Sequence, residues 1–163
     1  MYPRNVQIIH DSSSKVACKM TKSIIKTLGL VAPSIEAASY LVNQSSTNNN
    51  VPVQYIFLLT GGVLSNTSSM HAITSAVEQA AHSEIICVYK ECDEDKWDWS
   101  LVAALKLERS SMLTKVQGSL WGHEAYKYRA PQPEHRMYEH QAFVTNMVVR
   151  MPAWSATAQQ QRT

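Results

Sequence analysis

The sequence has 163 residues, of which 45% are hydrophobic, and this length fits one domain with a sizeable buried core. Its 15 basic and 13 acidic residues give a formal net charge of +2, and no basic run stands out. This balance argues against a protein that binds nucleic acid through phosphate contacts, so we expect no nucleic-acid partner.

Neither a membrane span nor a secretory leader is expected. No apolar run reaches about 18 residues, and residues 1–5 contain no apolar signal segment. The three cysteines lack paired spacing, which argues against a disulfide framework. Cys18 and Cys87 lie in apolar stretches and are expected in the core, whereas Cys92 lies in an acidic segment and is expected to be exposed. We therefore predict a protein of the reducing cytoplasm.

Apolar patterning predicts that strands and helices alternate along the chain. Short apolar runs bounded by polar residues or proline are typical of strands, and apolar residues at i+3 and i+4 predict helices with one core-facing side. Residues 53–59 predict the strongest strand, because their nearly continuous apolar character suits burial on both faces. In chain order, we expect a strand at 6–10, a helix over 16–28 that ends at Gly29, a strand at 30–32, a short helix over 35–42, a strand at 53–59, a helix over 70–80 capped by Ser68 or Ser69, a strand at 84–89, a helix over 101–107, a strand at 116–121 and a helix over 135–151.

This alternation predicts an α/β fold in which right-handed crossovers build a five-stranded parallel sheet covered by helices on both faces. The expected architecture is a flavodoxin-like three-layer sandwich. We expect a single domain over residues 1–151 and a disordered polar tail over residues 152–163. Residues 44–50 contain no apolar side chain and predict a flexible loop.

Ligands of open parallel sheets bind beyond the carboxyl ends of the strands, so the segments that follow the strands are the candidate site. Asp11–Lys15 could hold an anion at a helix N-terminus, and ordinary helix capping is the alternative. The glycines at 61 and 62 could approach a phosphate or only permit a tight turn. The two common glycine-rich phosphate-binding motifs, G-x-x-x-x-G-K-[ST] and G-x-G-x-x-G, are both absent. The predicted ligand-binding residues are Asp11, Ser12, Ser13, Ser14, Lys15, Thr60, Gly61, Gly62 and Ser65.

Other site chemistries have little support in the sequence. A phosphate-accepting receiver domain needs a carboxylate at the end of the third strand, where Thr60 stands. The six histidines form no H-x-x-x-H pair and no cluster with cysteine, so we expect no metal site. The nucleophile motif G-x-S-x-G is also absent.

A series of short motifs resembles the TIR (Toll/interleukin-1 receptor) family. Many domains of that family carry a strand ending in L-L-T or L-S, a loop like G-V-L-S, a further buried strand and an aromatic-Asp-aromatic element before a helix. The matching segments here are Leu58-Leu59-Thr60, Gly62-Val63-Leu64-Ser65, Ile85–Val88 and Trp97-Asp98-Trp99. Their order carries the resemblance, which extends over residues 5–150 through the surrounding alternation of strands and helices.

The same resemblance implies that enzymatic chemistry has been lost. TIR domains that cleave NAD carry a catalytic glutamate in the helix after the third strand, and Ala72 stands at that position. A methyl group can neither accept a proton nor stabilise an oxocarbenium ion. Glu78, further along this helix, is the remaining acidic candidate. The link after the expected second strand, residues 32–34, is also shorter than the loop that TIR domains often use for homotypic contacts.

The resemblance therefore implies a protein-interaction or scaffolding domain of intracellular signalling, with a protein partner or a second copy of itself. The expected contact residues are Met70, His71, Trp97 and Trp99, because methionine and aromatic side chains offer large contact areas. For the tryptophans, closure of the core edge is the alternative. One competing hypothesis is a TIR-like enzyme or module that binds NAD or another nucleotide. Another is a flavodoxin-like domain that binds a flavin.

Overall fold

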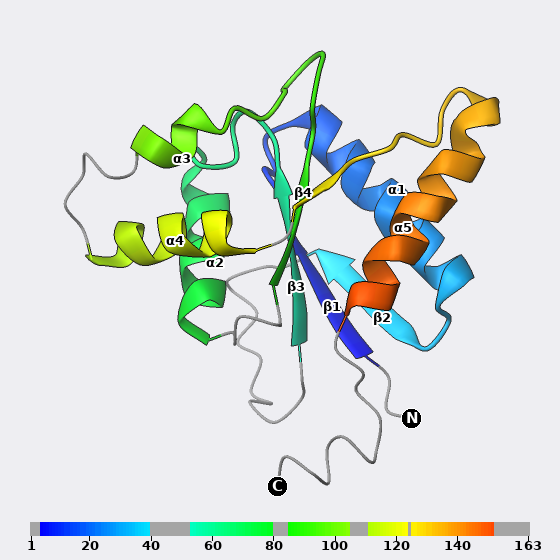
Figure 1. The fold of residues 1–163 in the computed structure, drawn as a ribbon, viewed down its shortest axis with the longest axis horizontal. Coiled ribbons are helices and arrows are strands. Elements are labelled where there is room, and N and C mark those ends of the chain that lie inside the picture. The colour runs from blue at the N-terminus through cyan, green and yellow to red at the C-terminus, as the bar shows by residue number, and fades with distance from the viewer. Residues whose placement is uncertain (1–3, 40–52, 80–84, 105–110, 124, 152–163) are drawn as a thin grey trace, which may run out of the picture.

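The computed structural model describes residues 4–39, 53–79, 85–104, 111–123 and 125–151 (Figure 1). These residues form a five-stranded, all-parallel sheet with helices on both faces, which confirms the predicted α/β, flavodoxin-like class. The strands are β1 (Arg4–Ile9), β2 (Ile35–Ser39), β3 (Val53–Leu59), β4 (Ile85–Tyr89) and β5 (Ala125–Lys127). The helices are α1 (Lys15–Val31), α2 (Thr67–Gln79), α3 (Ser100–Ala104), α4 (Ser111–Gly122), the 3-10 turn η3 (Glu134–Arg136) and α5 (Met137–Arg150).

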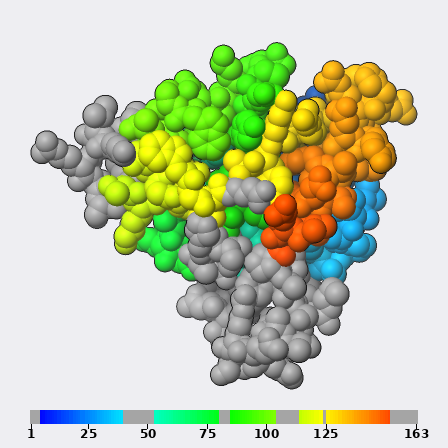
Figure 2. Space-filling view, viewed as in Figure 1, coloured from blue at the N-terminus to red at the C-terminus, as the bar shows by residue number. Residues whose placement is uncertain are grey.

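The strand order is β2-β1-β3-β4-β5, so the chain moves outward in one direction after β1 and in the other direction after β3. Right-handed crossovers then place α1 on one face of the sheet and α2, α3 and α4 on the other. Helix α5 returns to the face of α1, and in the space-filling view it forms the flank opposite α3 and α4 (Figure 2). The reversal between β1 and β3 is the topological switch point, where open α/β sheets bind ligands.

Alternating side chains of the central strands supply two separate cores. On β3, Ile56 and Leu58 pack toward α1 and α5, whereas Tyr55 and Phe57 pack toward α2 and α4. Every residue of β3 after Val53 is buried, as the continuous apolar run predicted. The strands expected at 6–10, 53–59 and 84–89 are confirmed as the adjacent parallel strands β1, β3 and β4.

The first predicted helix continues beyond Gly29, so the strand expected at 30–32 is wrong. Leu30 and Val31 belong to the last turn of α1 and face solvent. The helix ends at Ala32, whose N–H donates to the Leu28 carbonyl at 2.9 Å. Pro33 ends the helix instead of the glycine, because a residue before proline is disfavoured in helical geometry while a helical glycine costs only about 1 kcal/mol.

The second strand is β2, in the segment for which the sequence predicted a short helix over 35–42. The i, i+3 spacing of Ile35 and Ala38 suggested a helical stripe, but alternate residues Ile35 and Ala37 are the ones that pack toward α1. Residues 35–39 pair in parallel with residues 4–8 of β1. An edge strand buries only one face, so five residues give too few apolar positions to separate the two periods.

The fifth strand was also misplaced. Residues 116–121, expected as a strand, lie within α4, where Val116 and Leu120 are buried at helical i, i+4 spacing. The strand is β5, three residues that pair with the end of β4. So short a strand leaves almost no pattern in the sequence, and its pairing with β4 defines it.

Two further helix boundaries differ from expectation. Asn66, instead of Ser68 or Ser69, caps α2, because its side-chain carbonyl accepts the Ser69 N–H at 3.0 Å. The helix expected over 135–151 begins with the 3-10 turn η3 and continues as α5. The predicted loop at 44–50, the tail at 152–163, and Ala80, Leu105 and Leu107 lie outside the described residues.

Candidate functional site

Three loops that follow strands, residues 11–15, 60–69 and 91–99, meet at the switch point on the carboxyl edge of the sheet. Asp95, in the loop after β4, joins them. Its Oδ2 accepts a short hydrogen bond of 2.5 Å from the Ser14 Oγ, and its backbone carbonyl accepts the Gly61 N–H at 2.9 Å. We name this group of loops the carboxyl-edge cluster. Its centre is therefore occupied by side chains and backbone of this chain.

The loop after β1 is ordered by capping interactions. The buried Asp11 carboxylate accepts hydrogen bonds from the Ser13 N–H at 3.0 Å and the Ser13 hydroxyl at 2.6 Å, both through Oδ1. Ser14 Oγ accepts the Ala17 N–H at 3.1 Å and so caps α1. Ser12 and Lys15 are exposed. Ordinary capping, the alternative to an anion site, accounts for the Ser14 hydroxyl, which also donates to the Asp95 carboxylate.

The two glycines after β3 permit a close approach of acidic side chains. A Cβ at Gly62 would lie 2.6 Å from Asp11 Oδ2, and one at Gly61 would lie 3.0 Å from Asp95 Oδ1. Real Cβ atoms do not come within 3.0 Å of such atoms, so a side chain at position 62 would force Asp11 to move. Gly61 and Gly62 therefore make room for carboxylates of this chain.

The remainder of the loop after β3 is held by local hydrogen bonds. Asn66 Nδ2 donates to Ser13 Oγ at 3.3 Å and links this loop to the first. Ser65 is exposed and donates to the Gly62 carbonyl, while the buried Ser69 donates to the Val63 carbonyl. Thr60 is fully buried, and within the described part of the chain its Oγ1 has no hydrogen-bond partner. Among the predicted ligand-binding residues that the structure describes, Thr60 is thus the one whose buried side-chain polar atom has no hydrogen-bond partner.

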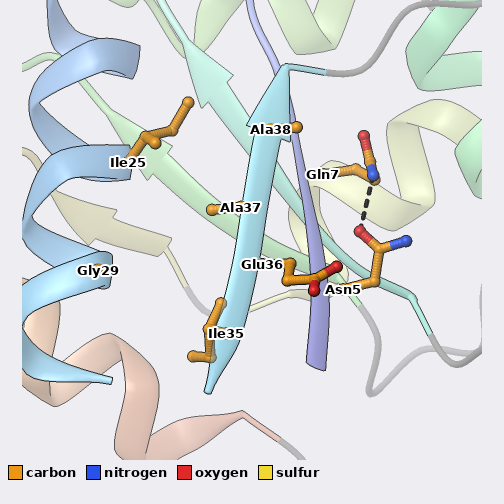
Figure 3. A pocket seen from close by; sticks show the side chains of 8 residues that line it. All are labelled: Asn5, Gln7, Ile25, Gly29, Ile35, Glu36, Ala37 and Ala38. Atoms are coloured by element: carbon orange, nitrogen blue, oxygen red, sulfur yellow. Dashed lines mark hydrogen bonds between the residues drawn. The ribbon is translucent and has the colours of Figure 1, made fainter. Parts of the chain in front are cut away.

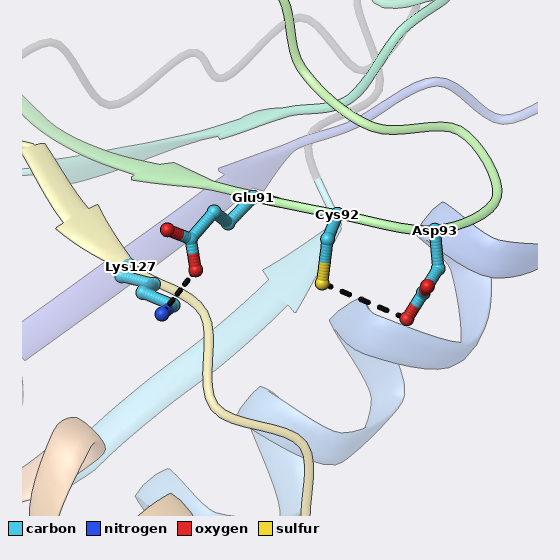
Figure 4. Close-up of polar contacts among 4 residues, drawn as sticks. All are labelled: Glu91, Cys92, Asp93 and Lys127. Carbon is cyan, nitrogen blue, oxygen red and sulfur yellow. Dashed lines mark hydrogen bonds and ion pairs between the residues drawn. The ribbon is translucent and has the colours of Figure 1, made fainter.

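The loop after β4 is acidic and conformationally defined. Asp93 and Asp95 have positive φ angles of 67° and 62°, a region that aspartate tolerates better than most residues. The Trp97 N–H donates to the Lys90 carbonyl at 2.8 Å and closes the loop. Glu91 forms an ion pair with Lys127, next to the weak contact from the Cys92 thiol to Asp93 (Figure 4).

The two tryptophans that follow this loop differ in exposure. Trp97 is buried in the core beneath α2 and α4, so it cannot serve as the partner-contact residue that the sequence suggested. Trp99 keeps 38% of its surface exposed. Its ring lies 5.6 Å from the Trp97 ring in an edge-to-face arrangement and 5.9 Å from the Tyr89 ring. The buried ring therefore supports the exposed one.

The two positions of α2 that the TIR resemblance singled out, Ala72 and Glu78, lie far apart in burial and along the helix. Ala72, at the position of the TIR glutamate, is buried in the apolar core. Glu78 is exposed near the far end of α2, about 16 Å along the helix from its first residue at 1.5 Å per residue. Of the expected contact residues, His71 is exposed, whereas Met70 is half-buried and packs on the core.

Two surface hollows border α1, one beside β2 and one next to the carboxyl-edge cluster. The larger, of about 590 Å³, surrounds the edge strand β2 and contains the hydrogen bond of 2.8 Å from Gln7 Nε2 to Asn5 Oδ1, with Glu36 nearby (Figure 3). It contains none of the residues predicted for a site. The smaller, of about 340 Å³, lies on the first turns of α1 and includes Ser12, Ser13 and Lys15.

The three cysteines of the described residues differ in their surroundings. Burial raises the pKa of the Cys87 thiol to about 12, so this core cysteine stays protonated and unreactive near neutral pH. Cys92 is exposed as predicted, whereas Cys18 is only half-buried and not fully in the core. No group of three or more His, Cys, Asp or Glu side chains among the described residues could hold a metal ion.

Sequence reasoning missed two residues that organise the site. Asn66 has a local signal, because asparagine before a helix is as good a cap as serine. Asp95 has no local signal in the sequence, because its hydrogen bond to Ser14 joins residues 81 positions apart. The comparison of residues 32–34 with the TIR loop was also misplaced, since that link precedes β2. Residues 40–52, which follow β2, lie outside the described residues.

Comparison with known proteins adds no family assignment. No protein-family model matches the sequence, and a search of curated proteins returns no significant match. Within the described residues, no helix has both the length and the apolar character that crossing a bilayer requires.

Proposed function

We propose that this protein is a TIR-like interaction or scaffolding domain of intracellular signalling, without catalytic activity of its own. The observation that carries the proposal is Trp99, an exposed aromatic side chain held by the rings of Trp97 and Tyr89. Tryptophan is enriched among the residues that dominate binding energy. A ring already held in place loses little conformational entropy when a partner covers it.

The surroundings of Trp99 favour a protein partner. The neighbouring Asp98 is exposed, and the Ser100 N–H that donates to it at 2.9 Å lowers its pKa. Asp93 and Glu94 in the same loop are also exposed. An aromatic anchor with a charged rim is typical of protein interfaces, in which the rim sets specificity and association rate.

The absence of catalysis has support from two positions. Ala72 supplies no acid or base, and it lies in the core instead of a cleft. Asp95 occupies the centre of the switch point through its bonds to Ser14 and Gly61. The phosphates of a nucleotide would there meet the carboxylates of Asp11 and Asp95, and like charges at short range repel.

A capture experiment with matched variants tests the interaction role. Wild-type protein, Trp99→Ala and Tyr138→Ala are immobilised and exposed to cell lysate, and retained proteins are identified by mass spectrometry. Tyr138 is the control because it is an exposed aromatic residue on α5. We expect a protein that wild type and Tyr138→Ala retain and Trp99→Ala loses, with all three melting at similar temperatures. Identical protein sets from all three baits would contradict the role of Trp99.

The enzyme alternative is tested with the same preparation. Purified protein is incubated with NAD while nicotinamide release is followed, and we expect no release above a protein-free blank. Release that Glu78→Gln abolishes would refute the non-catalytic assignment and identify a relocated acid.

Ligand binding at the carboxyl-edge cluster is the second candidate, and the unmet hydroxyl of buried Thr60 favours it. A small neutral ligand that donates a hydrogen bond would suit Thr60 and the neighbouring carboxylates better than a nucleotide. NAD, ATP and FMN are therefore expected to leave the thermal unfolding midpoint unchanged. A rise with any of them that Thr60→Val removes would instead favour a nucleotide or flavin site.

A further inference from the structure

We propose that a second copy of this chain docks its acidic loop, residues 91–98, on a row of lysines along α1. This inference rests on the proposed interaction function and names the partner and the surface. The row consists of Lys15, Lys19, Lys22 and Lys26, which we call the lysine row.

The lysine row lies on one face of α1. At 100° per residue, the spacing of four, three and four residues places the other three side chains within about 40° of the direction of Lys15 around the helix axis. All four lysines are exposed. The 17 residues of α1 include no acidic residue. Like charges at i, i+4 destabilise a helix, and Lys15 lies at the unfavourable positive end of the helix dipole. An anionic surface that covers the row would offset this repulsion, which gives a physical reason for four lysines on one face of the helix.

Among the described residues, no lysine of this row has a carboxylate oxygen within the 4 Å of a direct ion pair. The ion pair found among the described residues joins Lys127 to Glu91, and none involves α1. Lys15, Lys19 and Lys22 also border the hollow of about 340 Å³ on α1, together with the Ser12 and Ser13 hydroxyls. This hollow has room for carboxylate side chains and presents them with ammonium and hydroxyl donors.

The chain itself carries the complementary surface. Residues 91–98 contain five of its 13 acidic residues, and among them Asp93, Glu94 and Asp98 are exposed outside the Glu91–Lys127 pair. The bonds from Ser14 and Gly61 to Asp95 hold this loop in one shape. A loop that is already ordered loses little entropy on docking, and complementary charge steers the encounter.

The position of the two surfaces favours a closed pair. The Ser14–Asp95 hydrogen bond places the acidic loop beside the N-terminus of α1, and Figure 4 shows Asp93 above this helix. A surface that is basic on one side and acidic on the other is complementary to itself across a two-fold axis. Each copy then supplies one lysine row and one acidic loop, so both contacts form together.

Charge exchange between two variants tests this contact. The first variant carries Lys19→Glu and Lys22→Glu. The second carries Asp93→Asn and Glu94→Lys, with asparagine at 93 because it tolerates the positive φ. A control with Lys115→Glu and Arg136→Glu makes the same charge change as the first variant at exposed positions on α4 and η3. Masses are measured by light scattering after size exclusion, and folding by circular dichroism.

We expect wild type and control to form pairs at low salt, and to dissociate at about 0.5 M salt, where the Debye length shortens to about 4 Å. Each variant alone should bind itself at least tenfold more weakly. An equimolar mixture of the two variants should restore the pair, because every acidic surface then meets a basic one. Assemblies larger than pairs that follow the same pattern would support the contact and replace the closed pair by an open chain.

Other outcomes overturn the proposal. A wild-type monomer at every concentration, or pairing that both variants retain, would refute the contact. Binding of wild type to vesicles containing phosphatidylserine, lost in the lysine variant without any pairing, would assign the lysine row to a lipid surface instead. These results leave the capture by Trp99 untouched, so failure of this proposal is distinguishable from failure of the interaction function.

Discussion

The two faces of the sheet are held by different forces. Beneath α2 and α4, the core is formed by apolar and aromatic side chains such as Phe57 and Trp97. Beneath α1 and α5, the apolar core is supplemented by a fully buried histidine, His140. Its Nδ1 lies 2.6 Å from the Arg129 carbonyl and its Nε2 lies 2.8 Å from the Thr27 hydroxyl.

This difference shows how α1 obtains a defined orientation. A carbonyl only accepts hydrogen bonds, so Nδ1 of His140 donates to Arg129, while Nε2 contacts the Thr27 hydroxyl and lies 3.4 Å from the Ser23 carbonyl, both on α1. Apolar contacts are non-directional, whereas these bonds are directional: the one to Thr27 joins α5 to α1, and the one to Arg129 joins α5 to the segment after β5. The α1–α5 face, which carries the lysine row outward, is thus the more precisely oriented layer. On the opposite face, the buried Gln117 Nε2 donates to the Val102 carbonyl at 2.9 Å and joins α4 to α3, while apolar and aromatic side chains fill the space between α2 and α4.

The largest expected loss of folding stability comes from a substitution in the core beneath α2 and α4. Phe57→Ala removes a fully buried ring at the centre of the sheet and leaves a cavity. We expect a loss of about 3–5 kcal/mol in the free energy of unfolding, measured by urea denaturation. A loss below about 1 kcal/mol would show that this face is loosely packed and remove the contrast between the layers.

The next effect tests the directional bonds of the other face. His140→Ala leaves the Arg129 carbonyl and the Thr27 hydroxyl without their histidine partner in a buried position, and should cost about 1–3 kcal/mol. Hydrogen exchange should speed up in α5 and in the contacting part of α1 before it does in α2. Equal acceleration on both faces would mean that the histidine contributes general packing and not orientation.

A smaller effect compares the start of α1 with the start of α2. Ser14→Ala removes the cap of α1 and the bond to Asp95, with an expected cost of about 1 kcal/mol. Ser68→Ala serves as the matched control, because Ser68 is exposed and Asn66 caps α2. Thermal unfolding should separate Ser14→Ala from wild type and leave Ser68→Ala unchanged. Similar losses from both would contradict the assigned caps.

The smallest expected effect is a pH dependence of folding stability that comes from His10, the residue after β1. Burial lowers the pKa of His10 below 6.5, although the Ile8 backbone and the Asp11 charge oppose the shift. Between the lowered pKa and about pH 6.5 the unfolded chain therefore binds a proton while the folded chain stays neutral, so stability is complete above this window, falls as the pH drops through it, and levels off below the lowered pKa. Urea midpoints at several pH values should show this slope, and His10→Asn should flatten it. An unchanged slope in the variant would assign the effect to other histidines.

An element could be predicted from the sequence when its own residues carry a clear apolar pattern, and not when it depends on contacts with distant residues. β3 was predictable because a strand buried on both faces needs an apolar residue at nearly every position. β2 and β5 lie at the edges of the sheet and are three to five residues long, too short for a period of 2 to be told from a period of 3.6. The position of the candidate site was predictable too, because its loops follow the ends of strands. The hydrogen bond from Ser14 to Asp95 was not predictable, because it joins residues 81 positions apart.

The order of apolar and polar residues by itself determined the α/β class, the three central strands and the position of the candidate loops, because burial is encoded residue by residue in hydrophobicity. Tertiary structure alone decided that Asp95 fills the switch point, that Trp97 is buried beneath an exposed Trp99, and that the acidic loop lies beside the lysine row. These are contacts between residues far apart in the chain, and no local periodicity records which distant partners the folded sheet brings together.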